Sequence, residues 1–156
     1  MPVDPIPAGY HSLTPYLVVE EAARAIEFYK MAFGAEELLR LEGPGGSVAH
    51  AEVKVGDSPL MLADENPEMG FRAPGALGGT PVTLMFYVED VDQVFAQALE
   101  AGATALRPVE DQFYGDRAGT LQDPFGHIWT VATHTEDLTP DQLAERMAEV
   151  MSEDDG

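Results

Sequence analysis

The sequence lacks cysteine altogether and is poor in basic residues. Without cysteine there are no disulfides and no thiolate metal ligands, which fits a cytoplasmic chain. Two lysines and six arginines accompany 28 acidic residues, so the formal net charge at pH 7 is −20. Such a charge repels nucleic acid and anionic membranes, and neither is an expected partner. Two interpretations of the charge stay open: it keeps the protein soluble, as in a salty cytoplasm, or it attracts a cationic ligand.

Long apolar runs are missing as well. None approaches the ~18 residues that a membrane-spanning helix needs. The first residues, Met1 to Pro5, have neither the basic region nor the apolar segment of a secretory signal, so a cytoplasmic location is expected. With 45% hydrophobic residues, the 156-residue chain can form one ordinary domain, or two small modules that share a core.

The sequence does contain one pattern of predicted elements that occurs twice. Each copy has a short apolar strand, an amphipathic helix that ends at a Gly-Ala pair, and three further strands. The predicted elements of the first copy are strands at 13–19, 36–41, 48–55 and 59–63 and a helix at 21–33. Those of the second copy are strands at 82–88, 104–109, 120–122 and 127–133 and a helix at 91–101.

These boundaries predict one domain of two modules, at about residues 12–65 and 82–136. The linker between them, 66–81, is rich in glycine and proline and is interpreted as a flap over a pocket. Residues 111–119 are predicted to form a polar loop. Thr139-Pro140 is a good N-cap and first-turn pair, so a C-terminal helix is expected at about 139–152, outside the repeat.

The predicted strand at 48–55 alternates between apolar and polar side chains. Four apolar residues share one face: Ala49, Ala51, Val53 and Val55. His50, Glu52 and Lys54 share the other face, because successive side chains of a strand point to opposite sides. The apolar face suits packing under the helix of the module. His50 and Glu52 are therefore expected to face a cleft.

Several motifs within the two modules carry a family resemblance. They include Ala25-Ile26-Glu27-Phe28-Tyr29 followed by Phe33-Gly34-Ala35, then Thr14-Pro15-Tyr16-Leu17, His50-Ala51-Glu52, Gln112-Phe113-Tyr114-Gly115-Asp116-Arg117 and Asp123-Pro124-Phe125-Gly126-His127. In tandem modules these motifs resemble the vicinal oxygen chelate (VOC) superfamily of glyoxalase I, bleomycin-resistance proteins and extradiol dioxygenases. More narrowly, they resemble its PhnB-like branch.

The resemblance implies an α+β fold of tandem βαβββ modules, the glyoxalase/bleomycin-resistance-like fold. Each mixed sheet curls, carries its helix on the convex side, and forms a cleft with the other sheet. A homodimer is expected, because family dimers are common and some exchange modules between chains. The fold does not decide the function, because this superfamily contains enzymes and plain binding proteins.

The resemblance also implies a divalent metal, held by His, Gln and Glu side chains from the first and last strands of each module. Counted from the motifs, those positions fall at Thr14, at Thr83, at Met61 or Leu62, and at Thr130. None is a histidine or a carboxylate. The usual ligand set is therefore not in its usual places, and the metal and its ligands are left unassigned.

His50 and Glu52 are the catalytic candidates. His50 could be a general base or hydrogen-bonding group of the pocket, a metal ligand, or a structural residue. Glu52 could orient His50, act as a base, or form an ion pair with Lys54 or Arg117. A single histidine and a single carboxylate form at most part of a metal site.

Tyr114, Arg117 and Met85 are the ligand-binding candidates. Arg117 has the planar fork that suits a carboxylate or phosphonate, and an ion pair with Asp116 or Asp111 is the alternative. Tyr114 could cover the pocket or simply pack. Met85 is an adaptable lining residue.

Three hypotheses about function follow. The first is a glyoxalase-like enzyme that acts on a small oxygen-rich molecule, with lyase or isomerase chemistry. The second is a metal-free binding protein of the bleomycin-resistance type that sequesters a small compound, with a cationic one favoured by the charge. The third is a structural or regulatory module whose C-terminal helix contacts a partner.

Overall fold

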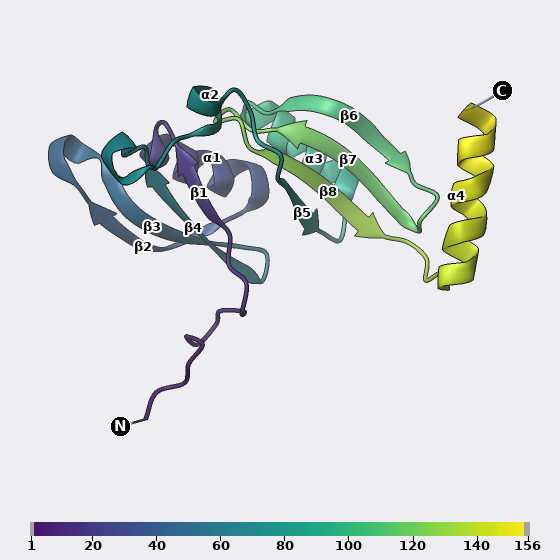
Figure 1. Cartoon of the computed structure of the whole chain (residues 1–156), viewed down its shortest axis with the longest axis horizontal. Helices are drawn as coiled ribbons and strands as arrows, with labels where there is room; N and C mark the ends of the chain where they lie inside the picture. The colour runs from purple at the N-terminus through teal and green to yellow at the C-terminus, as the bar shows by residue number, and fades with distance from the viewer. Residues whose placement is uncertain (1, 155–156) are drawn as a thin grey trace.

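The computed structural model describes residues 2–154 and contains two four-stranded mixed sheets, one from each module (Figure 1). The elements of module one are β1 (Tyr16–Val19), α1 (Ala22–Phe33), β2 (Glu36–Glu42), η1 (Pro44–Gly46), β3 (Val48–Val55) and β4 (Ser58–Asp64). The elements of module two are β5 (Thr83–Tyr87), α3 (Val91–Ala101), β6 (Thr104–Asp111), β7 (Asp116–Gln122) and β8 (Ile128–His134). The linker contains η2 (Pro67–Met69) and α2 (Pro74–Leu77), and α4 (Pro140–Asp154) follows module two.

The two sheets have the same topology, which confirms the predicted α+β fold. The strand orders are β1-β4-β3-β2 and β5-β8-β7-β6. In each sheet the first strand is parallel to the last, and the other neighbours are antiparallel. Each helix connects its first strand to the far edge of the sheet.

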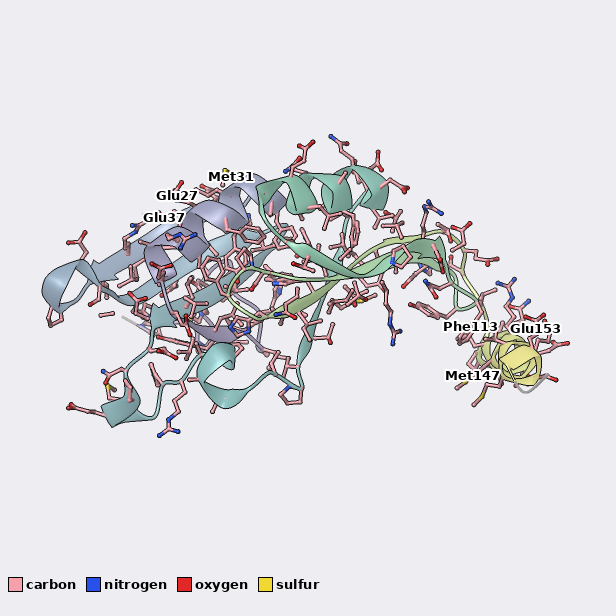
Figure 2. The ribbon with its side chains drawn as sticks, turned by 90° about the horizontal axis from the view of Figure 1, so that it is seen from above. Glu27, Met31, Glu37, Phe113, Met147 and Glu153 are labelled. Carbon is pink, nitrogen blue, oxygen red and sulfur yellow. The ribbon has the colours of Figure 1, made fainter. Side chains whose placement is uncertain are left out.

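The core lies between the sheets and the helices. Figure 2 shows α1 and α3 on one side of the sheets and the linker, with η2 and α2, on the other. On the helix side of β3 and β4, Ala51, Val53 and Leu62 are fully buried beneath α1. We call the side turned away from α1 and α3 the open face. In sheet one it includes Tyr16, Val18, Glu36, Leu39, Leu41, His50, Glu52, Lys54 and Met61, and in sheet two Met85, Tyr87, Arg107, Glu110, Asp116, Thr120, Thr130 and His134.

Two local predictions were wrong. Ala49 is exposed and Val48 is buried, because the β2–β3 ladder shifts its register between Leu41 and Glu42 and thereby reverses the alternation at the start of β3. The polar loop predicted at 111–119 is shorter: β6 continues to Asp111 and β7 begins at Asp116. Gly115, at φ 93°, permits the tight turn between these strands.

A buried carboxylate joins the two modules. Asp123, in the turn between β7 and β8, accepts hydrogen bonds from the Tyr29 hydroxyl on α1 (2.6 Å) and from the Trp129 indole (3.0 Å). It also accepts from the backbone N–H groups of Phe125 and His127. Each module therefore contributes a donor to the same buried acceptor.

The final helix stands apart from the sheets (Figure 1). Thr139 and Gln142 form reciprocal cap hydrogen bonds at its start, as the sequence predicted for Thr139. Arg146 holds α4 to the body by bonds to Glu136 and to the backbone oxygen of Phe113, which lies beside α4 in Figure 2.

None of the helices described in residues 2–154 has both the length and the apolar character needed to cross a membrane.

Candidate functional site

A chain of three polar side chains lies on the open face of sheet one. The Tyr16 hydroxyl is 2.9 Å from His50 Nδ1, and His50 Nε2 is 2.7 Å from Glu52 Oε2. Strand pairing brings them together: Tyr16 lies across from Met61 on β4, and Met61 lies across from Glu52 on β3. The structure thus joins the two predicted catalytic candidates and adds Tyr16, to which the sequence analysis assigned no role.

The direction of these hydrogen bonds follows from the acceptor at the end of the chain. The ionised Glu52 accepts, so His50 Nε2 carries a hydrogen. In neutral His50, Nδ1 is then an acceptor and Tyr16 donates to it. When His50 is protonated, Nδ1 donates to the Tyr16 oxygen and the hydroxyl hydrogen becomes free for another acceptor.

Tyr16 is the member of the chain that a small molecule can reach most easily. Its exposed fraction is 42%, whereas the side chains of His50 and Glu52 are exposed by 24% and 16%. Partial burial raises the pKa of Tyr16 above its ordinary value, so the hydroxyl stays protonated near neutral pH. Tyr16 therefore presents its hydroxyl oxygen to the open face, with the His50–Glu52 pair behind it.

The linker contributes an aromatic side chain to this site. The Phe71 ring packs against Tyr16 with 5.8 Å between ring centroids, and His50 packs on Tyr16 at 5.5 Å. Two backbone hydrogen bonds between Asn66 and Phe71 close this part of the linker into a tight turn. Part of the predicted flap therefore lies next to the site.

Sheet two carries a different polar chain on its open face. Asp116 accepts from the Tyr87 hydroxyl (2.8 Å) and lies 2.8 Å from His134 Nδ1, and His134 Nε2 lies 2.8 Å from Asp137. Asp116 is almost fully buried, at 3% exposure. The hydrogen bonds to Asp116 and Asp137 raise the pKa of His134, and the bond to Asp116 is the main cause of the raised pKa of Tyr87.

An apolar groove of about 660 Å³ separates module one from β5. Met85 and Tyr87 form one wall, and the other comes from Leu13, Pro15 and the β3–β4 turn. The predicted ligand-binding residue Met85 therefore lines a groove that adjoins the open face.

The structure separates the other two ligand-binding candidates. Burial is the main cause of the raised pKa of Tyr114. The nearby charge of Asp116 raises this pKa further, and the charge of Arg107 lowers it. Arg117 lies on the helix side, where it makes two bonds of 2.9 Å to Asp92 on α3 and one of 3.3 Å to Asp111. It is therefore not brought to His50, Glu52 or Tyr114.

The residues present do not fit the metal site that the resemblance implied. Within residues 2–154, no three histidine, aspartate or glutamate side chains are grouped so that they could hold a metal ion. At the expected positions, Met61 and Thr130 do lie on the open face, and Thr130 is hydrogen-bonded to Thr120. A thioether and a hydroxyl are poor ligands for the divalent ions of this fold.

The family model of the Glyoxalase/Bleomycin resistance protein/Dioxygenase superfamily matches residues 10–131. The chain belongs to this superfamily. The match spans both modules, so the sequence resemblance to the VOC superfamily is confirmed.

Individual proteins are similar to this VOC chain in sequence or in structure. The protein Mb0911c of Mycobacterium bovis is 44% identical over 140 residues, which cover 88% of this chain and 92% of that protein. The structure of TioX from Micromonospora sp. ML1 superposes with a TM-score of 0.65 at 27% identity, covering 80% of this chain and 98% of TioX. A PhnB protein of Bacillus cereus has a TM-score of 0.62 at 21% identity, covering 79% and 99%, and so shares the fold.

Tyr16 could have been found from the sequence. Tyr16 and Val18 alternate with Leu17 and Val19 in the predicted first strand, and the latter two are buried. The same alternation argument that placed His50 on an open face also places Tyr16 there. Phe71 had no such signal, because a loop has no fixed side-chain period.

Proposed function

We propose that the protein acts on a small oxygen-rich molecule bound on the open faces of its sheets, with lyase or isomerase chemistry that depends on proton transfer. The observation that carries this proposal is the hydrogen-bonded chain Tyr16–His50–Glu52. It combines a hydroxyl group that the substrate can reach and that can relay a proton, a base behind it, and a carboxylate that holds the base. Met85 and Tyr114 would contact the body of the substrate from sheet two.

Each member of the chain has a defined part in this chemistry. In the neutral state of His50, a proton removed from a carbon next to a carbonyl passes to the Tyr16 oxygen as the hydroxyl proton moves to His50 Nδ1. Glu52 then faces an imidazolium and stabilises it. Returning the proton to a neighbouring carbon completes an isomerisation, and loss of a leaving group completes a lyase reaction. No step is assigned to a metal, because the residues at the usual positions do not fit one.

A homodimer would complete this site. Large side chains remain uncovered on the open faces of both sheets: Leu39 is 40% exposed, Leu41 51%, Met85 46% and Tyr87 56%. Covering such apolar surface is favourable by about 25 cal/mol per Å². If sheet one of one copy lies over sheet two of the other, Tyr16–His50–Glu52 faces Met85 and Tyr114 across an enclosed cleft. Light scattering of the intact protein should give twice the mass of one chain.

A metal-free binding protein is the second candidate. The observation that favours it is the side-chain chemistry at the usual metal positions, together with the polar chain on the open face, which can serve recognition as well as proton transfer. This candidate predicts saturable binding of small molecules without any chemical change in them.

Hydrogen exchange in D₂O distinguishes the two candidates without knowledge of the product. Proton NMR would follow loss of the carbon-bound hydrogen in a panel of small α-hydroxy and α-keto carbonyl compounds. We expect exchange with the unmodified protein, reduced about 10²-fold or more in His50→Ala and in Tyr16→Phe. His11→Ala and Tyr10→Phe are matched controls, because both residues precede β1 and take no part in the chain.

Exchange that survives in His50→Ala would show that the base lies elsewhere, and the proposed roles would be wrong. Binding of a compound, seen as chemical-shift changes, without exchange of its hydrogen would favour the binding protein over the enzyme.

A further inference from the structure

The basic side chains divide into two groups according to what they contact. Five form ion pairs: Arg24 with Glu21, Lys30 with Glu27 and Glu37, Arg40 with Glu37, Arg117 with Asp92 and Asp111, and Arg146 with Glu136. Within residues 2–154, no carboxylate oxygen lies within 4.0 Å of Lys54, Arg72 or Arg107. Three of the eight basic side chains therefore lack a carboxylate partner within the described residues, although the chain has 28 acidic residues.

The three unpaired basic side chains share a side of the molecule. Lys54 follows His50 and Glu52 at alternate positions of β3, so it lies on the open face. Arg107 lies across the β6–β7 ladder from Thr120, whose hydroxyl bonds to Thr130 on the open face of sheet two. Arg72 lies in the linker between η2 and α2, on the side of the sheets opposite α1 and α3 (Figure 2). We call Lys54, Arg72 and Arg107 the open-face cations.

The paired basic side chains lie elsewhere. Arg24 and Lys30 are on α1, and Arg146 is on α4. Arg40 lies across from Ala51, which is buried beneath α1. Arg117 lies across from Thr133, whose hydroxyl accepts from the first N–H of α3. The basic side chains that pair with carboxylates therefore lie on the helix side or on α4, and those without a carboxylate partner in the described part of the chain lie on the open face.

The acidic side chains of the open face do not neutralise these cations. Glu52 is hydrogen-bonded to His50, and Asp116 to Tyr87 and His134. Glu36 is the cross-strand neighbour of Lys54, and Glu110 lies on the strand of Arg107, but no carboxylate oxygen of either residue lies within 4.0 Å of a nitrogen of these cations. The open-face cations are left free to bind a group that the protein does not supply.

We propose that the ligand of the open face is an anion: a small molecule with an apolar body and a carboxylate, phosphonate or similar oxyanion group. In the dimer of the proposed function, Lys54 and Arg72 of one copy face Arg107 of the other copy and bind the oxyanion. The apolar groove takes the body, because Pro59, the cross-strand partner of Lys54, lines it together with Met85. This inference rests on the proposed function, in which the open faces form the ligand site. It replaces the interpretation of the acidic charge as an attractor for a cation.

The acidity of the rest of the molecule makes this arrangement selective. The net charge of −20 repels anions at long range, but ions screen that field beyond about 8 Å at physiological salt. At contact, the nearest charges dominate. An anion is therefore held where the cations are unpaired and is excluded from the remaining surface.

Two probes that share one ring system test the sign of the ligand charge: 1-naphthoate and 1-naphthylmethylammonium. Their dissociation constants would be measured by calorimetry with the full chain. NMR of the methionine methyl groups would locate the probe, because Met61 and Met85 lie on the open face and Met31 and Met147 do not. We expect naphthoate to bind about tenfold more tightly than the ammonium compound, and to shift Met85.

The variants separate local charge from net charge. Lys54→Gln with Arg107→Gln removes one open-face cation from each sheet and should abolish the preference for naphthoate. Arg24→Gln with Lys30→Gln removes the same amount of charge from α1 and should keep the preference. Arg72→Gln should weaken naphthoate binding by about threefold.

Equal affinity for the two probes, tighter binding of the ammonium compound, or an equal loss in the two double variants would overturn the anionic ligand while leaving the open-face site in place. If neither probe binds or shifts Met61 and Met85, the open-face site fails as well, and the proposed function fails with it.

Discussion

Modules one and two have the same fold but different open faces. The shared register of the ladders makes Ala51 equivalent to Gly119 and Leu62 equivalent to Val131. By the same register, Ala118 and Thr120 in module two occupy the places of His50 and Glu52. The helix sides stay apolar in both, because they must be buried. The comparison shows that burial requires apolar residues on the helix side of both modules, whereas the residues of the open face can differ between them.

The polar chains of the two modules also differ in order. In module one the histidine stands between a tyrosine and a carboxylate. In module two the carboxylate Asp116 stands between Tyr87 and His134. Tyr87 donates to Asp116, so its proton is engaged by a carboxylate, whereas Tyr16 donates to His50 and can pass its proton to that ring when the ring is neutral. In the proposed reaction the polar chain of module one therefore transfers the proton, and that of module two holds its side chains in a fixed arrangement.

Substitutions in the turn between the third and fourth strands should give the largest difference between the two modules in the free energy of unfolding. Asp123→Ala would leave the donors of Tyr29, Trp129 and the turn backbone without their acceptor, and should lower the free energy of unfolding by about 3 kcal/mol or more. Asp57→Ala, in the exposed turn of module one, should change it by less than about 0.5 kcal/mol. Urea denaturation measures both. Equal effects would mean that Asp123 does not join the modules.

The packing beneath the two helices gives the next difference. Phe95 of α3 occupies the place that Ile26 occupies in α1, and the larger ring is accommodated by Gly119 in place of Ala51. A Cβ at Gly119 would lie 2.9 Å from Phe95 Cε2 and 2.8 Å from Val109 Cγ2. Gly119→Ala should therefore destabilise the protein by about 1–3 kcal/mol.

Denaturation of the double variant Gly119→Ala with Phe95→Ile checks the packing argument. Because the smaller side chain makes room for the added methyl group, the double variant should lose less stability than the sum of the two single variants. Additive losses would show that the ring and the glycine are not matched in size.

The histidine of module two gives the smallest effect. The folded state raises the pKa of His134 above the unfolded value of about 6.5. The stability that comes from its charged form is then fully present below pH 6.5 and is lost as the pH rises through the folded pKa. NMR titration of the ring should show the raised pKa, and Asp137→Asn should lower it. An unchanged pKa in that variant would contradict the contribution of Asp137.

The sequence predicted most of the fold because the helix sides carry periodic signals. The spacing on α1 and the glycines that end both helices placed the repeat, and the alternation in β3 placed His50 and Glu52. The errors occurred where periodicity fails. A register shift exposed Ala49, and the charged strand around Asp116 lacks an apolar face that would distinguish it from a loop. The position of Arg117 depends on the pairing of β7 with β8. Because residues 111–119 were predicted to be a loop, this pairing was not predicted.

The hydrogen bond between Tyr29 and Asp123 has a consequence for the order of folding during synthesis. Module one leaves the ribosome first, and all the ladders of its sheet lie within residues 16–64. Module two forms its last turn around a buried carboxylate that takes a donor from α1. Because amino-terminal units fold first as the chain emerges, we expect module one to be assembled before that turn and to serve as its template.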